Sequence, residues 1–231
     1  MTGSGTPPRQ TTDAGQLRRA LRARRRALSP SQQAAASAAL DTVVAALPAF
    51  RRARRIGFYL AHGGEIDPAP LRRRAERLGK RCFLPVLHPL GHNRLHFVAW
   101  REGEPLVRNR FGIAEPLLRR PVPTWSLDLI LVPLVAFDAA GNRLGQGAGF
   151  YDRALAFRRR GRRHPRLIGL AHAFQQVPQL AAAPWDVPLD GIATERALFT
   201  ASNFLTASNF LTASNFLTAR VSLTARSQHH A

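Results

Sequence analysis

The chain is poor in several features, and each scarcity excludes a class of protein. It contains one cysteine, Cys82, so no internal disulfide can form. No apolar run approaches the roughly 18 residues that a transmembrane helix needs. The first residues, MTGSGTPPRQTTDAGQ, lack the apolar centre of a secretory signal. We therefore expect a soluble, cytoplasmic protein with no membrane partner.

Lysine is almost absent, yet the chain is strongly basic. Lys80 is the only lysine, while Lys and Arg together number 34 against 14 Asp and Glu, for a formal net charge of +20. Such a balance attracts polyanions. However, replacement of lysine by arginine fits a GC-rich coding sequence, and the arginine runs are spread along the chain, at Arg22–Arg26, Arg51–Arg55, Arg72–Arg74 and Arg158–Arg163. We interpret them as solvated faces and expect no specific nucleic-acid partner.

Apolar periodicity predicts the fold class. Helical spacing is expected over residues 13–28, 31–47, 68–78 and 149–159, and buried or half-buried strands over 56–61, 81–87, 95–100, 127–132, 167–171 and 192–195. Ser29 followed by Pro30 is a helix-start signal for the second helix. Strands that alternate with helices predict an α/β fold with three layers, in which helices cover both faces of a mainly parallel, Rossmann-like sheet.

The two ends of the chain differ from its centre. Residues 1–12 are rich in Gly, Pro and Thr, and we expect them to be disordered. Residues 13–199 form the expected catalytic domain. Residues 200–231 are a low-complexity tail that begins with three copies of TASNFL, a period too short for a solenoid repeat. We expect this tail to be disordered or loosely helical, with an aggregation-prone or partner-docking segment as the alternative.

A glycine-rich segment, RLGQGAGFYDR at Arg143–Arg153, follows the expected strand 127–132. The loop after a buried parallel strand lies at the sheet edge where ligands bind. Glycine lets backbone N–H groups approach an anion, and Arg143 adds a bidentate partner for phosphate. Phe150 breaks the dinucleotide fingerprint, and no Gly-Lys-Ser/Thr follows to make a Walker A loop. The pattern predicts a nucleotide-phosphate site with Asp152 as a metal ligand behind it.

Other motifs occur in order along the chain. They are Leu17-Arg18 and Arg26–Ser29, Gly64–Asp67 (GEID), Gly79–Pro85, Gly112–Pro116, Pro133–Arg153 and Asp190–Glu195. Together, over about residues 14–199, they resemble the 5-formyltetrahydrofolate cyclo-ligase family, also called methenyltetrahydrofolate synthetases. The resemblance implies a NagB/RpiA/CoA-transferase-like fold. It also implies a monomer that uses ATP as co-substrate and Mg²⁺ to close 5-formyltetrahydrofolate to 5,10-methenyltetrahydrofolate, with release of ADP and phosphate.

The resemblance also assigns residues. Those implied to bind ATP are Arg18, Arg143, Leu144, Gly145, Gln146, Gly147, Ala148, Gly149, Phe150 and Tyr151. Those implied to bind the folate are Leu60, Glu65, Gln146, Gly147, Ala148, Gly149 and Phe150. Arg143, Tyr151 and Asp152 are the implied catalytic residues, and Asp152 and Asp190 the implied Mg²⁺ ligands, with the hard oxygens that this ion prefers.

The sequence departs from the family pattern at four places. Ala14 stands where a lysine is usual, Gln146 where Tyr or Arg is common, Phe150 where the first Tyr is expected, and Leu134 where glycine is usual. Two other functions stay open at this point: a different small-molecule kinase or ligase on the same scaffold, and a non-catalytic, basic RNA-associated module.

Overall fold

An eight-stranded sheet organises the computed structural model, which describes residues 14–88, 94–117, 120–161 and 164–200. Its order is β12-β11-β10-β7-β1-β2-β3-β6. The strands are β1 Arg55–Gly57, β2 Arg81–Leu87, β3 Leu95–Ala99, β6 Pro121–Val122, β7 Leu129–Pro133, β10 Arg166–Leu170, β11 Gly191–Ala193 and β12 Leu198–Thr200. The five strands from β11 to β2 are parallel, and antiparallel strands extend both edges. The predicted mainly parallel sheet is confirmed.

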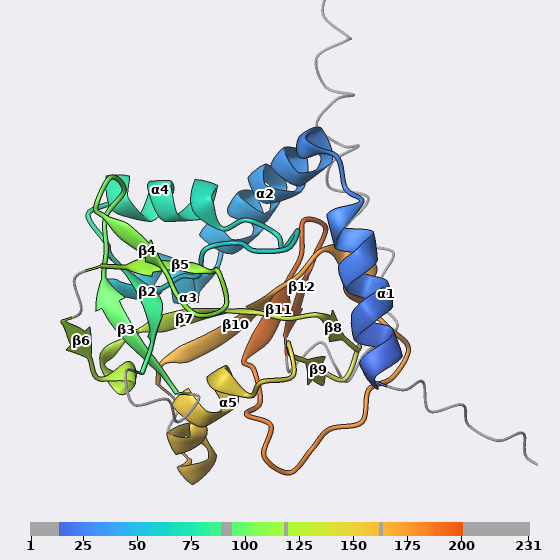
Figure 1. Cartoon of the computed structure of the whole chain (residues 1–231). Coiled ribbons are helices and arrows are strands. Elements are labelled where there is room, and N and C mark those ends of the chain that lie inside the picture. Colours follow the sequence, from blue (N-terminus) through green and yellow to red (C-terminus); the bar gives the residue numbers. More distant parts are fainter. Residues whose placement is uncertain (1–13, 89–93, 118–119, 162–163, 201–231) are drawn as a thin grey trace, which may run out of the picture.

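Helices lie on both faces of this sheet (Figure 1). They are α1 Ala14–Arg26, α2 Pro30–Ala45, α3 Pro48–Arg52, α4 Ala69–Arg77 and α5 Phe150–Ala154. In Figure 1, α2, α3 and α4 cover one face, α5 lies against the other, and α1 stands beside the end of the sheet near β8. Two hairpins, β4 Leu106–Arg108 with β5 Ala114–Pro116 and β8 Ala136–Phe137 with β9 Arg143–Leu144, complete the described part.

Strand β7 shows why the apolar run in the sequence is continuous. Leu129 and Leu131 belong to the core under α2 and α4, whereas Ile130 and Val132 belong to the core that includes Leu155 at the end of α5. Side chains alternate between the two faces of a strand, so a strand that is covered on both faces must be apolar at every position. The three-layer prediction follows from this pattern and is confirmed.

Several predicted boundaries are wrong for local reasons. The second helix ends at Ala45 because Pro48 starts α3, and Leu47 before it is held in an extended conformation. The helix predicted over 149–159 ends at Ala154 and continues as a 3-10 helix, Ala156–Arg160. The strand predicted over 56–61 is assigned only over Arg55–Gly57. The short strands β4, β5, β6, β8, β9 and β12 were not predicted.

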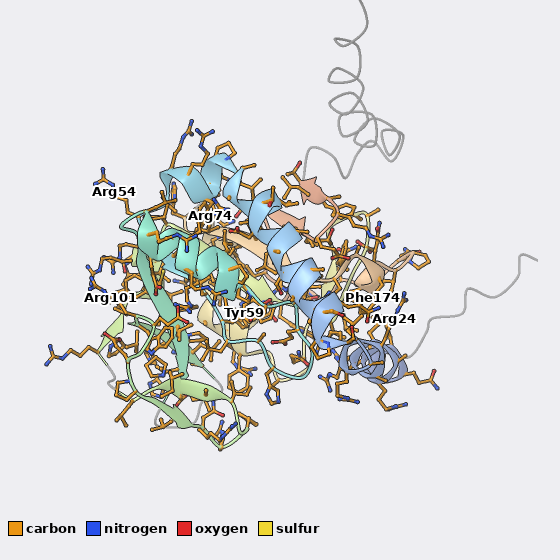
Figure 2. The ribbon with its side chains drawn as sticks, turned by 90° about the horizontal axis from the view of Figure 1, so that it is seen from above. Arg24, Arg54, Tyr59, Arg74, Arg101 and Phe174 are labelled. Carbon is orange, nitrogen blue, oxygen red and sulfur yellow. The ribbon has the colours of Figure 1, made fainter. Side chains whose placement is uncertain are left out.

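The interpretation of every arginine run as a solvated face is also wrong. Arg25 and Arg72 are buried, at 2% and 4% exposure. The Arg72 guanidinium lies 4.8 Å from the centre of the Trp100 ring and pairs with Glu76 and Glu102. Others do project outward, as Arg54 and Arg101 do in Figure 2.

The remaining expectations concern the ends of the chain and the membrane. None of the helices in the described part of the chain is long and apolar enough to cross a bilayer. The predicted disordered segment 1–12 lies outside the described residues, as does the tail from residue 201 onward.

Candidate active site

Three chain segments that follow parallel strands meet close to α1. The turn Gly63–Glu65 comes after β1, the glycine loop 145–149 comes after β7 and the β8–β9 hairpin, and His172 comes just after β10. The carboxyl ends of parallel strands lie at one edge of a sheet, so the topology brings these segments together. Figure 1 shows α1 at this edge, next to β8.

Arginines of α1 hold the glycine loop. Arg18 Nε donates to the Gly145 carbonyl at 2.9 Å, and an Arg22 amino group donates to the Gln146 carbonyl at 2.7 Å. The two side chains are four residues apart and share a helix face. A carbonyl oxygen bound to a guanidinium is not turned toward an incoming phosphate, so these contacts suit a loop that binds an anion.

Glycine is required at two positions of this loop. Gly147 has φ +106° and Gly149 has φ +64°, conformations that side-chain-bearing residues rarely adopt. The segment between them is open, because Gln146, Gly147 and Ala148 are all exposed. The loop therefore presents its backbone to solvent at the edge where the predicted ATP and folate residues converge.

The glycine loop and the turn after β1 are joined directly. Gln146 Nε2 donates to Glu65 Oε1 at 2.6 Å, across 81 residues of sequence. The backbone N–H of His62 donates to Glu65 Oε2 at 3.2 Å. Burial raises the pKa of Glu65, and the nearby Arg25 guanidinium opposes that rise. Leu60, also predicted to bind folate, is partly buried against the core five residues before Glu65.

Arg143 and Asp152, predicted to bind phosphate and metal, are paired with each other. Both also contact Val187: the Arg143 guanidinium donates to its carbonyl, and its N–H donates to Asp152 Oδ1 at 3.2 Å. Asp152 belongs to α5, immediately after the glycine loop. The hydrogen bonds of Asp152 among the described residues go to Oδ1. Its carboxylate therefore lies just after the glycine loop, with Arg143 as its charged partner.

Asp190 has different surroundings. It accepts from Arg158 and Arg166, each at 2.9 Å, and from the N–H of Leu167 at 2.7 Å. It precedes β11 and therefore lies at the amino ends of the parallel strands, whereas Glu65 follows β1 at their carboxyl ends. No hydrogen bond or ion pair between the described residues links Asp190 to Asp152.

The carboxylates near the glycine loop limit how Mg²⁺ could be held. Within the described ranges, no group of three or more His, Cys, Asp or Glu side chains is placed to hold a metal ion. Mg²⁺ commonly binds through one or two carboxylates together with substrate phosphates. The residues present thus fit a metal carried by the nucleotide, with Asp152 as the available carboxylate.

Tyr151 carries a buried hydroxyl group that has no hydrogen-bond partner in the described structure. Burial, with a further contribution from Glu65, raises the pKa of this phenol, which therefore stays neutral. Buried polar groups without partners are rare and often mark a place where a ligand binds. The equivalent group of Tyr59, by contrast, donates to the Ile66 carbonyl at 2.7 Å.

Three residues near the site were not predicted from the sequence, and a fourth, Arg22, was considered only as a substitute for the lysine that Ala14 replaces. Arg25 was treated as part of a solvated run, although its spacing from Arg18 and Arg22 places all three on one helix face. His172 is 1% exposed and lies beside Gly64. Phe111, at the tip of the β4–β5 hairpin, packs edge-on against Phe150 with ring centres 5.6 Å apart. No sequence signal marks these last two.

Comparison with known proteins now decides the family. The 5-formyltetrahydrofolate cyclo-ligase family matches residues 10–195 of the chain. The chain belongs to the 5-formyltetrahydrofolate cyclo-ligase family. The Escherichia coli K12 protein named 5-formyltetrahydrofolate cyclo-ligase is 40% identical over 176 residues, which cover 75% of this chain and 96% of that protein. The mouse protein of the same name is 29% identical over 190 residues, 78% of this chain and 92% of that protein.

Solved structures of this cyclo-ligase family share the fold. The NMR structure of Aquifex aeolicus 5,10-methenyltetrahydrofolate synthetase aligns with a TM-score of 0.69 and 30% identity, over 81% of this chain and 92% of that one. A Mycoplasma pneumoniae 5,10-methenyltetrahydrofolate synthetase aligns with a TM-score of 0.63 at 24% identity, over 79% of this chain and 99% of that one. The α/β architecture is therefore that of the family.

Proposed function

We propose that this chain is an ATP- and Mg²⁺-dependent 5-formyltetrahydrofolate cyclo-ligase that forms 5,10-methenyltetrahydrofolate. The observation that carries the proposal is the Gln146–Glu65 hydrogen bond at 2.6 Å, since it joins the loop predicted to hold the nucleotide to the turn predicted to hold the folate. The two substrates must meet for phosphoryl transfer, and this contact is where they would do so. Membership of the cyclo-ligase family and the names of the relatives support the same activity.

The reaction converts a poor leaving group into a good one. The formyl oxygen takes the γ-phosphoryl group of ATP, the neighbouring folate nitrogen attacks the activated formyl carbon, and phosphate leaves. Catalysis of this kind depends on positioning and on stabilising charge, because the protein itself makes no covalent bond. A bound Mg²⁺ would neutralise charge on the nucleotide phosphates, with Asp152 as its protein ligand.

The chain's own residues have separable tasks in this proposal. The backbone of residues 145–149 holds phosphate oxygens, while Arg18 and Arg22 keep two of the loop carbonyls occupied. Arg143, which pairs with Asp152, supplies a guanidinium beside the transferring group. Glu65 accepts from the donors of the pterin ring. The unpartnered hydroxyl of Tyr151 donates to a substrate oxygen. We further propose that the enzyme is monomeric and cytoplasmic.

A turnover assay tests the proposal. Purified protein with 5-formyltetrahydrofolate, ATP and Mg²⁺ should generate the absorbance of the methenyl product together with one equivalent of phosphate. Omission of ATP or addition of a chelator should abolish the signal. A stable phosphorylated product would instead indicate a kinase on this scaffold, and folded protein that gives no product would refute the assignment.

A further inference from the structure

Arg25 is a buried cation at the folate side of the site. Its side chain is 3% exposed, and its one carboxylate partner among the described residues is Glu65, with NH1 and Oε1 3.8 Å apart. A second contact, from NH1 to the Leu134 carbonyl, is long at 3.5 Å. Its Nε is buried without a hydrogen-bond partner in the described structure. A buried charge with so few partners depends strongly on the one opposite charge beside it.

The turn that carries Glu65 is fixed against Arg25 from several sides. Gly64 has φ +79°, and a Cβ there would lie 2.6 Å from the Arg25 carbonyl oxygen, so only glycine lets α1 pack this closely. Gln33 Nε2 donates to the Gly64 carbonyl at 3.1 Å and to the Arg25 carbonyl at 3.4 Å. The end of α1 and the turn after β1 are therefore closely packed and share the Gln33 side chain as a donor.

His172 also contacts this turn. Its Nε2 lies 3.2 Å from the Gly64 carbonyl, which can only accept, so this nitrogen carries the proton. The His172 ring stacks on that of Phe174 with centres 5.3 Å apart. The Arg24 guanidinium of α1 lies over the Phe174 ring, 4.3 Å from its centre. Figure 2 shows Arg24 and Phe174 side by side. Burial lowers the pKa of His172, so it remains a neutral donor near neutral pH.

The groups that face the Glu65 carboxylate come from five parts of the fold. Arg25 of α1 is the permanent cation, and Gln146 of the glycine loop donates its side-chain amide to Oε1 at 2.6 Å. His62 of the same turn donates its backbone N–H, and its imidazole also acts to lower the pKa of Glu65. Tyr59, after β1, and Tyr151, of α5, are neutral phenols whose burial and proximity to Glu65 raise their pKa values. Among these groups, Arg25 supplies the permanent positive charge that offsets desolvation of the carboxylate.

From this geometry we propose that Arg25 is a positioning residue for the folate side of the site. Its buried guanidinium keeps the Glu65 carboxylate ionised and aimed where the pterin ring binds, so that Glu65 acts as an acceptor. The inference rests on the proposed cyclo-ligase function and deepens it. Arg25 acts through Glu65 and does not touch the substrate.

The variant Arg25→Gln tests the proposal through a pH profile. Without the guanidinium, Glu65 keeps its proton up to a higher pH, so as the pH falls the variant should lose folate binding sooner than wild type does. We expect the acidic limb of the kcat/KM profile for 5-formyltetrahydrofolate to move up by about one to two pH units. The KM for the folate should rise about tenfold on that limb and converge with wild type at high pH. The kcat and the KM for ATP should change little.

Three further variants complete the design. Arg26→Gln removes the same charge from the next, exposed position of α1 and should leave the limb unmoved. Arg25→Lys keeps the charge and should return the limb toward wild type. Glu65→Gln should lack the acidic limb that comes from titration of Glu65. The double variant Arg25→Gln, Glu65→Gln should have the same pH profile as Glu65→Gln alone. The proposal would be overturned if the pH profile of Arg25→Gln matched that of wild type. It would also be overturned if kcat/KM fell equally at all pH values and for both substrates.

A readout without turnover separates this proposal from the proposed function. The chain has six glutamates, so the Glu65 carboxyl carbon can be assigned by ¹³C NMR with Glu65→Gln as reference. Its apparent pKa should be higher in Arg25→Gln than in wild type whether or not the enzyme turns over folate. If Arg25→Gln does not fold, the Glu65→Gln profile decides: an acidic limb that persists unchanged in that variant refutes the role of Glu65, and with it that of Arg25.

Discussion

At the scale of single residues, Asp152 and Asp190 differ in their surroundings, although both have the same implied role. Both were predicted as Mg²⁺ ligands. Asp152, just after the glycine loop, has one arginine partner, Arg143, and the N–H of Val187, whereas Asp190 binds two arginines and a backbone N–H at the other edge of the sheet. A carboxylate that already offsets two guanidinium groups contributes mainly to folding. The assignment of Asp190 as a ligand stays a prediction, and its surroundings favour a structural task.

Substitution of the two aspartates should therefore have different results. Asp190→Asn leaves Arg158 and Arg166 without their carboxylate and should lower the free energy of unfolding by about 1–3 kcal/mol, measured by urea denaturation. Asp152→Asn should instead abolish Mg²⁺-dependent turnover while the unfolding midpoint changes less. An active Asp152→Asn enzyme, or an Asp190→Asn enzyme of wild-type stability whose Mg²⁺ requirement has changed, would contradict this division.

At the scale of elements, α2 shows a local signal that sequence reads well. Ser29 Oγ accepts from the N–H of Gln32 at 3.2 Å, and the Gln32 side chain accepts from the N–H of Ser29 at 2.8 Å, which makes a reciprocal capping box ahead of Pro30. The predicted start of this helix is confirmed because all of its determinants lie within four residues. The helix also presents Leu40 and Val44 to the core.

Removal of this cap should destabilise the protein without touching the site. Ser29→Ala leaves the N–H of Gln32 without its side-chain acceptor and should cost about 1 kcal/mol. Differential scanning calorimetry should report a lower Tm. Ser31→Ala is the matched control, since the Ser31 side chain contacts only the Ser29 hydroxyl among the hydrogen bonds of the described residues. Equal Tm values for the two variants would show that the cap does not stabilise the protein.

Elements set by distant contacts could not be predicted in the same way. β7 was recognised because a strand covered on both faces is apolar throughout, but β4, β6 and β12 are three residues or fewer and leave no periodic trace. The sequence motifs located Glu65 and Gln146 but not the bond between them. Arg25 resembles its exposed neighbours in sequence, and only the packing of α1 over Gly64 shows that it is buried.

At the scale of the whole molecule, part of the excess of arginine binds backbone carbonyl groups. Arg18, Arg22, Arg108 and Arg159 all donate to carbonyl oxygens, and Lys80 donates to those of Arg51 and Ala53. With few carboxylates available, carbonyls take their place as acceptors. These cations thus have structural partners within the fold, and the absence of a specific nucleic-acid partner stays a prediction.

Helix α1 should be the element most sensitive to ligands. It is attached to the rest of the site through side-chain contacts such as those of Arg18, Arg22 and Arg25, which do not extend the sheet ladder. Contacts of this kind open more easily than a central strand. We expect ATP with 5-formyltetrahydrofolate to slow tryptic cleavage after Arg24 and Arg26, followed by mass spectrometry. Cleavage after Arg101, an exposed position outside the site, is the internal control, and equal protection at both places would refute a specific effect.

The contacts of α1 also place a condition on how the enzyme is made. Arg18, Arg22 and Arg25 bind the carbonyls of Gly145, Gln146 and Leu134, which lie 127, 124 and 109 residues further along the chain. During synthesis, these contacts of α1 can therefore form only after the glycine loop has been translated. A nascent chain that stalls before the glycine loop would be unable to assemble the site.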